Sequence, residues 1–574
     1  MDRRTIFGLF MIALIIILYP FYMQAVAPPA DPSVKTTLAV DSTSTPTHPD
    51  TLLQSKTNIS KESDLPKTVS LTKDTIKQSE KIIRINSEIY SAEISNLGGG
   101  SIKSWKILPY KTHDGQPVDF IESSKNLNLN FVFQGKNYNT WNIPYSIINT
   151  DSVIDLITKQ KNTLTFVYHF DSERQIIQNL TFYNDRYDVD IEVQFKNFGD
   201  DITNGEYQIQ WLSALKSTEL DRNGDLSHTI SYAYMGDEKE EFDIGTDPSK
   251  ETTWSGVTKW VASRTKYFAV YIIPQEKDGI GCKLTSTTTH ENGLLTKKSN
   301  FMNIQMKFEP NVVDRYKFYI GPMDYHILKE YDDNVAVTME WGWAVFRPLT
   351  KAIFYTFNFL YDIIPNYGWV IIVFTLLVRI VLYPLTYKTF VGMQKMKVVM
   401  PRQKEIQKKY KDNPSRMQQE MMKLYKEAGY NPLSGCLPML IQMPLLFPIY
   451  QVFNQSIELR LAPFFGWITD LSRPDTITIL HTGLPFIGDF HVNPLPIIMT
   501  VLTFLQQKIA PMTPMGDDSD PAQRFNQKFL MYGMPIMFFF LFNGFASGLV
   551  LYWTVFNVLT MAQQVMMQKF VEVK

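Results

Sequence analysis

Long apolar stretches near its C-terminal end constrain this chain more than any other feature. Within 574 residues they cover positions 368–387, 433–453, 494–511, 529–545 and 548–566. A helix needs about 20 apolar residues to cross the hydrocarbon core of a bilayer, where each backbone N–H and C=O must be bonded within the segment. A sixth apolar run lies at 6–22, directly after Arg3 and Arg4. The sequence therefore predicts a membrane protein with six helical spans.

The N-terminal run fits two interpretations. Residues 25–27 (AVA) have the small-x-small pattern of a cleaved signal peptide. However, the run of about 17 residues is longer than the usual apolar core of such a peptide, roughly 7–15 residues. Pro28 also follows the candidate cleavage site, and its rigid tertiary amide is a poor scissile bond. An uncleaved anchor over residues 1–26 is therefore favoured.

The region between the anchor and the other spans is polar. Residues 27–80 are rich in Pro, Ser, Thr, Asp and Lys, which predicts a disordered tether. Residues 81–328 change to short alternating strands, for example at 82–85, 164–168 and 187–193, with glycine-rich turn signals between them. This pattern predicts an all-β, sandwich-like domain that is large enough for its own core. A mean hydropathy of −0.13 fits such a soluble domain joined to an apolar one.

The remaining residues complete a multi-domain membrane protein. Residues 341–362 mix Trp and Phe with Arg347 and Lys351, which suits an amphipathic helix in the membrane interface. Residues 363–574 then form an all-α core of five spans. The loop at 388–428 carries eleven basic and four acidic residues, a net charge of +7. By the positive-inside rule this loop and both termini are cytoplasmic, and the β domain lies outside.

Arg379 is a charge within the apolar stretch 368–387. It lies eight residues before Tyr387, or about 12 Å along a helix. A charge at that depth costs at least roughly 2.5–3.5 kcal/mol, and none of the six apolar stretches contains Asp or Glu. Water, polar side chains, lipid phosphate or a carboxylate of another molecule must therefore solvate it. A partly hydrated cavity is favoured over snorkelling to phosphate.

Polar residues on other spans are candidates for lining such a cavity. Their spacing places several of them on shared helix faces. They are Thr375, Gln442, Thr500, Thr503, Gln507, Trp553, Asn557, Thr560 and Gln564. Each of them singly fits an ordinary hydrogen bond between membrane helices. Taken together, and beside an unpaired arginine, they favour the cavity.

The loop at 388–428 predicts an antiparallel helical hairpin. A first helix to Tyr410 is expected to break at Pro401, and a second covers 415–427 after a turn at 412–414. Its surface carries Lys404, Lys408 and Lys409 as well as Met417 and Met421. The methionines either pack the two helices together or offer an adaptable surface for varied apolar segments. The basic charge suits anionic lipid or ribosomal RNA.

Motifs of enzymes and of coupled transporters are missing. The sequence has no phosphate-binding loop, no His-Glu-x-x-His and no Gly-x-Ser-x-Gly, so we expect no catalysis, no cofactor and no metal. Without carboxylates in the spans, an ion-coupled carrier is also disfavoured. Two alternatives stay open. One is a small-molecule transporter, although no internal repeat is visible. The other is an envelope-assembly protein that binds through the β domain.

Several motifs carry a resemblance to a known family. They are NYGW at 366–369, YPLT at 383–386, GYNPLSGCLP at 429–438, LIQMP at 440–444, GLVLYW at 548–553 and the glutamine pair 563–564. In order and spacing they resemble the YidC family of membrane protein insertases in its Gram-negative form, over about the last 230 residues. YIGP at 319–322 and the β domain match more loosely.

The resemblance implies a protein that inserts and folds integral membrane proteins in the bacterial inner membrane, and no DNA partner. The β domain would be a periplasmic supersandwich. The five-helix core would enclose a hydrophilic groove that contains Arg379. Clients would touch the third span near Gln442, Met443 and Leu446 and the sixth near Tyr552 and Trp553. The protein would act alone on small clients and with the Sec translocon on larger ones. Ribosome docking by a basic tail is doubtful, because only Lys569 and Lys574 follow the last span.

Overall fold

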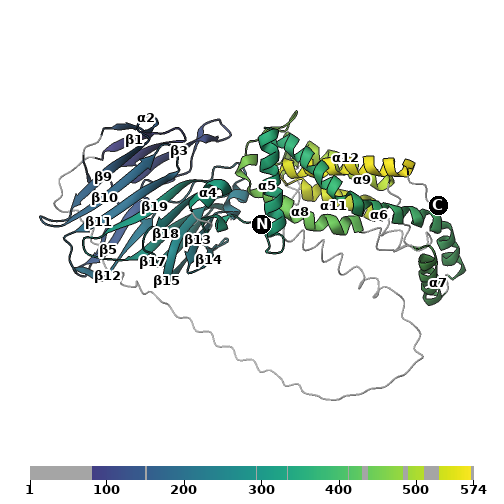
Figure 1. Ribbon diagram of the computed structural model, residues 1–574, viewed down its shortest axis with the longest axis horizontal. Coiled ribbons are helices and arrows are strands. Elements are labelled where there is room, and N and C mark those ends of the chain that lie inside the picture. The colour runs from purple at the N-terminus through teal and green to yellow at the C-terminus, as the bar shows by residue number, and fades with distance from the viewer. Residues whose placement is uncertain are drawn as a thin grey trace, which may run out of the picture.

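The computed structural model describes residues 80–148, 151–291, 294–331, 334–410, 413–429, 437–481, 489–509 and 529–570. The expected anchor at 1–26 and all but the last residue of the expected tether at 27–80 lie outside these ranges. The described residues form two parts, a β domain and a helical part, which lie next to each other along the longest axis of the molecule (Figure 1).

Nineteen strands among the described residues build the β domain, and alternating burial explains why the sequence forms many of them. β10 (Gln175–Tyr183), for example, buries every second residue, as a strand with one face on a core must. The strands expected at 82–85, 164–168 and 187–193 are present in β1, β9 and β11. These three strands cover Ile82–Asn86 (β1), Lys161–His169 (β9) and Asp188–Lys196 (β11). The other strands are β2 Tyr90–Ser95, β3 Ser101–Lys111, β4 Pro117–Asp119, β5 Leu127–Phe133, β6 Lys136–Asn139, β7 Ser146–Ile148, β8 Val153–Asp155, β12 Ile202–Trp211, β13 Ile230–Met235, β14 Glu238–Phe242, β15 Ser249–Arg264, β16 Phe268–Pro274, β17 Gly279–Glu291, β18 Leu294–Lys307 and β19 Val313–Pro322.

The strands form two sheets that share one core, which confirms the sandwich-like β-rich domain. The smaller sheet has the order β4-β3-β2-β1-β8, and only β1 and β8 run parallel. The larger sheet has 14 strands on the path β6-β5-β12-β18-β17-β15-β16-β19-β11-β10-β9-β7, with β13 and β14 attached through β15. The glycine turn before β3 lets the sheets approach closely. Gly100 has φ +118°, and a Cβ there would lie 2.5 Å from the Leu180 side chain of β10.

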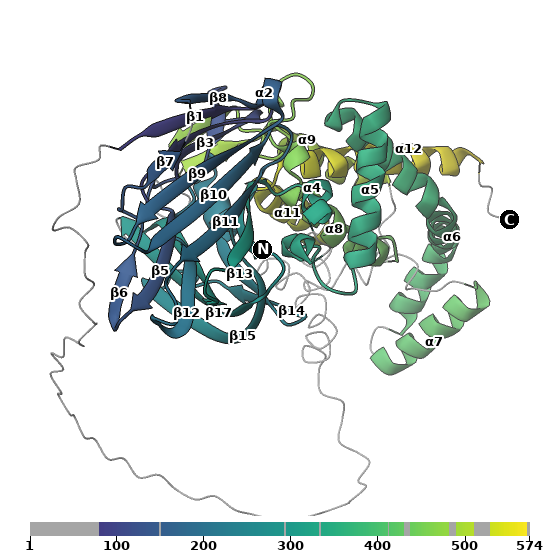
Figure 2. The ribbon, with the colours of Figure 1, turned by 60° about the vertical axis from the view of Figure 1, so that its left-hand side comes forward.

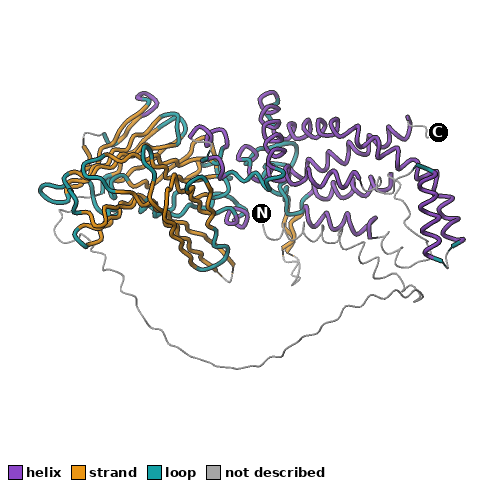
Figure 3. The backbone as a smooth tube through the Cα atoms, turned by 60° about the horizontal axis from the view of Figure 1, so that its bottom comes forward, coloured by secondary structure: helices purple, strands orange, loops and turns teal. Residues whose placement is uncertain are grey.

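The helical part follows the β domain. Its main helices are α4 Tyr325–Tyr331, α5 Arg347–Ile363, α6 Tyr367–Lys409, α7 Pro414–Glu427, α8 Leu437–Gln455, α9 Pro494–Ile509, α11 Met534–Phe542 and α12 Ser547–Phe570. Short helices are α2 Leu156–Lys159 and α3 Arg222–Ser227 within the β domain, the 3-10 turns Val335–Thr338 and Ile457–Leu459, and the π-helical turn Phe529–Gly533 before α11. Figure 3 shows the long helices on one side and most strands on the other, with short helices among the strands and the small hairpin β20 (Thr478–His481) and β21 (Asp489–Val492) on the helical side.

All five C-terminal apolar stretches contain helices, in α6, α8, α9, α11 and α12. Two of these are long and apolar enough to cross a membrane by length and composition, at Tyr367–Tyr387 of α6 and Ser547–Gln568 of α12. α8 has 19 residues but contains Gln442 and two interior prolines, and α9 has 16 residues. A helical C-terminal region is therefore confirmed.

Two boundaries differ from the sequence-based expectation. α6 continues through Pro401 to Lys409, so the expected break there is wrong. A proline removes one hydrogen bond of a long helix and can bend the helix without ending it. α5 begins at Arg347 and not near 341, because Gly342 has φ +75° and Pro348 suits the first turn of a helix. Figures 1 and 2 both show α7 beside the end of α6, far from the β domain.

Candidate functional site

Arg379 lies on α6 and is buried, with 9% of its surface exposed. Thr375, one turn earlier, is fully buried and donates its hydroxyl to the Ile371 carbonyl of the same helix at 2.6 Å. The Thr375 hydroxyl is therefore satisfied within α6. The hydroxyl oxygen can still accept, but no hydrogen bond among the described residues joins Thr375 to Arg379.

The Arg379 guanidinium faces an aromatic ring. Its central carbon lies 4.9 Å from the ring centre of Phe556 on α12, which is a cation–π contact. In the described part of the chain no ion pair includes Arg379, and its buried Nε has no hydrogen-bond partner. A ring face cannot accept all five N–H donors of a guanidinium. The arrangement therefore calls for water or acceptors supplied by another molecule.

α12 presents two different faces to its neighbours. Tyr552 and Phe556 face α6, since the Tyr552 ring lies 6.3 Å from Phe374 and the Arg379 guanidinium covers Phe556. Trp553 faces α11 instead, with its ring 5.2 Å from Phe542. Asn557, one turn after Trp553, donates to the Thr503 hydroxyl of α9 at 2.9 Å. The sequence-predicted residues of α12 thus divide between an α6 side and an α9–α11 side.

Buried polar atoms without partners accompany these contacts. Within the described ranges they include the Tyr552 hydroxyl and one amide oxygen each of Gln507, Gln563 and Gln564. Gln563 uses its other amide atom to donate to the Thr386 hydroxyl of α6 at 3.1 Å. An unpaired buried polar atom costs about 1–3 kcal/mol, and ordered water generally satisfies such groups. Polar groups of α6, α9 and α12 therefore favour hydration of this region.

The candidate residues of α8 form a separate group. Leu446 is buried and Gln442 is half-buried, whereas the Met443 side chain lies outside the description. No hydrogen bond, ion pair or ring contact among the described residues joins Gln442 or Leu446 to Arg379. α8 packs on α5 and also meets α6 and α12.

In the helical hairpin of α6 and α7, the candidate lysines lie on one helix and the candidate methionines on the other. Lys404, Lys408 and Lys409 are exposed on α6, while Met417 and Met421 are half-buried on α7. The N-terminus of α7 is capped by the Asn413 side chain, which accepts from the Arg416 amide. Met417 and Met421 thus contribute to packing and still present part of their surface, so the structure is compatible with both functions considered for them.

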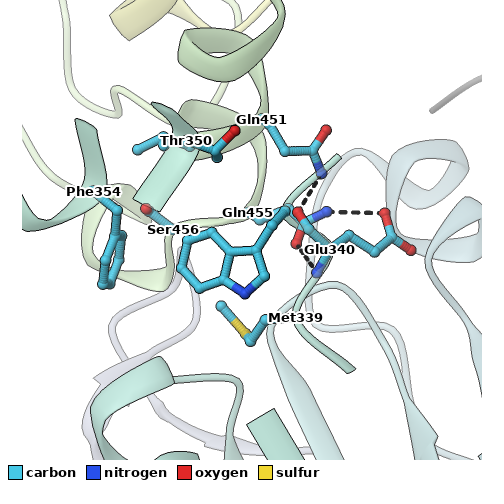
Figure 4. Close-up of a pocket in the computed structure, with 9 residues that line it drawn as sticks. Met339, Glu340, Thr350, Phe354, Gln451, Gln455 and Ser456 are labelled. Atoms are coloured by element: carbon cyan, nitrogen blue, oxygen red, sulfur yellow. Dashed lines mark hydrogen bonds between the residues drawn. The ribbon is translucent and has the colours of Figure 1, made fainter. Parts of the chain in front are cut away.

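Sequence reasoning missed a junction between the β domain and α8. Figure 4 shows Gln455 of α8 in a two-way contact with Glu340: its amide nitrogen donates to the carboxylate at 2.9 Å, and its oxygen accepts from the Glu340 amide at 3.0 Å. Gln451, one turn earlier, donates to the Glu340 carbonyl at 2.7 Å. A small pocket lies beside these hydrogen bonds and is lined also by Trp341 and Phe354. Burial raises the pKa of Glu340, but the neighbouring positive charges, of which Arg264 contributes most, together outweigh burial and leave the pKa below its usual value.

An ion pair completes this junction. Arg460, just after α8, bonds Glu219 at 2.7 Å, and their side chains are only 2% and 10% exposed. Arg460 also donates to the Lys111 carbonyl. Asn454 of α8 lies 3.2 Å from the His228 ring of the β domain. One signal was present in the sequence, because Gln451 and Gln455 recur one helical turn apart at the end of a span.

Two family models match nearly all of the described residues. The family model described as the YidC periplasmic domain matches residues 82–356, and the one described as the 60Kd inner membrane protein matches residues 359–574. The membrane protein insertase YidC of Chlorobaculum tepidum is 34% identical over 505 residues, which are 85% of this chain and 82% of that protein. The chain belongs to the YidC family of membrane protein insertases.

A second YidC, from Chlorobaculum parvum, is 32% identical over 576 residues, 98% of this chain and 94% of that protein. A solved active YidC insertase covers 86% of this chain at 18% identity, with a TM-score of 0.35. The family models and the two sequence relatives confirm the expected family. The YidC family acts on membrane-protein clients and is not a family of enzymes, and its β domain is periplasmic.

Proposed function

We propose that this YidC insertase moves short hydrophilic client tails through a polar groove between α6, α9 and α12 that contains Arg379. One observation carries the proposal. Arg379 is buried in an apolar helix, contacts an aromatic ring, and makes no ion pair with any described residue. Such a charge destabilises the empty protein unless water or a client group solvates it. The unpaired buried atoms of Tyr552 on α12 and Gln507 on α9 support a wet groove.

The topology that this mechanism needs has six spans. α6, α8, α9, α11 with its preceding π turn, and α12 would cross the inner membrane, together with an anchor at 1–26. The tether at 27–80 and the β domain at 81–328 would be periplasmic, and both termini cytoplasmic. α5 would lie in the interface: it crosses the direction of the other helices (Figure 1) and exposes Tyr355, Phe359 and Ile363.

Insertion in this scheme is physical and not chemical. Polar groups and water in the groove lower the desolvation penalty of a client tail, and Arg379 attracts its acidic residues. The apolar part of the client would leave into lipid along α8 at 442–446 and along α12 at Tyr552 and Trp553. Its burial in lipid is favourable by about 25 cal/mol per Å². The membrane potential adds about 2.3 kcal/mol per negative charge moved outward, per 100 mV.

The helical hairpin of α6 and α7 would receive clients on the cytoplasmic side. Its exposed lysines 404, 408 and 409 suit anionic lipid or ribosomal RNA, and the half-buried Met417 and Met421 suit apolar segments. Larger clients would require the Sec translocon. No described group of three or more His, Cys, Asp or Glu is arranged to hold a metal ion.

Reconstitution of the purified chain tests the proposal. A short client with one apolar segment is offered to liposomes that contain only this protein, and protease protection reports insertion. Insertion above that of protein-free liposomes is expected. A client with a long folded tail is the control and should stay outside. If the short client inserts no faster than into protein-free liposomes, the chain does not act alone.

A further inference from the structure

The β20–β21 hairpin between α8 and α9 has no role in the proposed groove. Its strands pair antiparallel, with Thr478 opposite Val492 and Leu480 opposite Phe490. All four residues of β20 are exposed. Figure 3 shows the two strands projecting from the end of the helical part that is nearer the β domain.

Apolar side chains of β20 lie on both faces of this hairpin. Ile477 is 59% exposed, Ile479 44% and Leu480 52%. Because side chains alternate along a strand, Leu480 lies on one face and Ile477 and Ile479 on the other. A two-stranded hairpin is only marginally stable in water, and one that exposes apolar groups on both faces lacks even a core of its own. The exposed apolar side chains of the hairpin therefore require surroundings that are less polar than water.

The root of the hairpin is fixed at the end of the helix bundle. The buried Asp475 accepts from the Leu495 amide at the start of α9 at 2.7 Å and from the Trp467 indole at 2.9 Å. On the other strand, Asn543 after α11 donates to the His491 carbonyl at 3.0 Å. The hairpin is thus held at the level where α9 begins and α11 ends.

Its surface continues onto a membrane helix. Phe490 contacts Phe539 of α11 with ring centres 6.2 Å apart, and Phe539 contacts Phe540. Phe540 and Ile536 of α11 are 62% and 55% exposed, as expected for a lipid-facing helix. Apolar surface therefore runs without interruption from α11 to the face of β20 that carries Leu480.

Exposed aromatic residues and the scarcity of charge both place the hairpin at the depth of the membrane interface. Trp369 at the start of α6, Phe465 and Trp467 are exposed at this end of the bundle. Tryptophan is enriched where membrane helices meet the interface. No Lys or Arg occurs between Arg473 and Lys508, and Asp489 at the start of β21 is the one Asp or Glu of the two strands, so the hairpin carries little charge. Its outer strand edges still need water for their backbone groups, which excludes the hydrocarbon centre.

We infer that the β20–β21 hairpin lies in the outer leaflet of the membrane, at the boundary between head groups and acyl chains, as a lateral anchor of the periplasmic end of α9 and α11. The inference depends on the proposed orientation but not on the groove or on client insertion. A protein partner on the same surface is the competing outcome.

Spin labelling of the full chain in phosphatidylethanolamine–phosphatidylglycerol liposomes tests it. Leu480→Cys carries the nitroxide in a Cys282→Ala, Cys436→Ala background, and Leu294→Cys on β18, whose native residue is 72% exposed, is the matched water-facing control. The expected result is a severalfold higher oxygen collision rate at 480, relative to a water-soluble nickel chelate, than at 294. His491→Cys, on the other strand, gives a second reading if the first variant folds poorly.

Equal nickel accessibility at 480, 491 and 294 in liposomes overturns the inference and leaves the surface to a protein partner. Client insertion is measured on the same samples. If the unlabelled protein does not insert the client while position 480 still reads as membrane-embedded, the groove is contradicted and the hairpin is not, so the two proposals fail separately.

Discussion

The junction ion pair between Arg460 and Glu219 allows a quantitative prediction. Glu219→Ala removes the carboxylate from a guanidinium that is 2% exposed. Breaking a buried pair on one side destabilises by about 3–5 kcal/mol, because the remaining charge stays buried. Arg460 keeps its bond to the Lys111 carbonyl and its position over the Phe268 ring, so the lower end, about 3 kcal/mol, is expected. Since each 1.4 kcal/mol is a factor of ten, the junction should open roughly a hundredfold more often.

Hydrogen exchange of the full chain in detergent measures this opening. Amides in the turn Ile457–Leu459 and at Arg460 should exchange about a hundredfold faster in Glu219→Ala. Glu276→Ala breaks an ion pair to Arg315 whose side chains are 63% and 47% exposed, and it should change exchange by less than about fivefold. Combining Glu219→Ala with Arg460→Met removes the stranded charge and should restore most protection. The reasoning is refuted if Glu219→Ala leaves exchange unchanged, or if the double variant exchanges as fast as the single one.

Further predictions concern topology, the helical hairpin and pH. In intact cells an impermeant maleimide should label Leu294→Cys but not Tyr410→Cys; labelling at 410 from outside contradicts the proposed orientation. Replacing residues 402–426 with a short Gly/Ser linker should abolish insertion while the protein still accumulates, and normal insertion would show the helical hairpin to be dispensable. Burial, aided by Asp324, raises the pKa of Glu458 to about 7 from 4.5. The folded state therefore loses stability as pH rises from about 4.5 to 7. Glu458→Gln should weaken the dependence of the melting temperature on pH between pH 5 and 8. A melting curve with the same pH dependence as the parent protein would contradict that origin.

Local pattern predicted much of the β domain and the helices. Alternation identified β1, β9 and β11, because a strand with one buried face must alternate. Apolar length identified the helical stretches near the C-terminus. The prediction of a break at Pro401 was wrong, because the loss of one hydrogen bond does not decide whether a long helix continues.

The arrangement of the candidate site depended on packing that spacing does not encode. Helical spacing groups Trp553 with Asn557, but only the fold shows that this face meets α11 and α9 while Tyr552 lies on the side of Arg379's ring partner Phe556. The junction at Glu340 joins residues more than 100 positions apart in sequence. Its glutamines are visible in the sequence, yet their partner is not.

The dependence of insertion on client charge tests the central proposal most directly. One client is prepared with its tail acids changed stepwise to Asn, and its insertion rate is measured with the parent protein and with Arg379→Lys, Arg379→Ala and Arg379→Glu. An ion pair at 4 Å contributes about 1 kcal/mol in water and about 4 kcal/mol near a protein, so loss of the charge should slow acidic tails at least about fivefold.

The proposal predicts that Lys retains much of the activity, that Ala impairs acidic tails more than neutral ones, and that Glu is worse than Ala for acidic tails. Some loss in the Lys variant is expected, because Lys lacks the planar fork of Arg and is more strongly hydrated. If Ala and Glu slow every tail equally, Arg379 acts through structure or hydration, and capture of acidic tails by its charge is wrong.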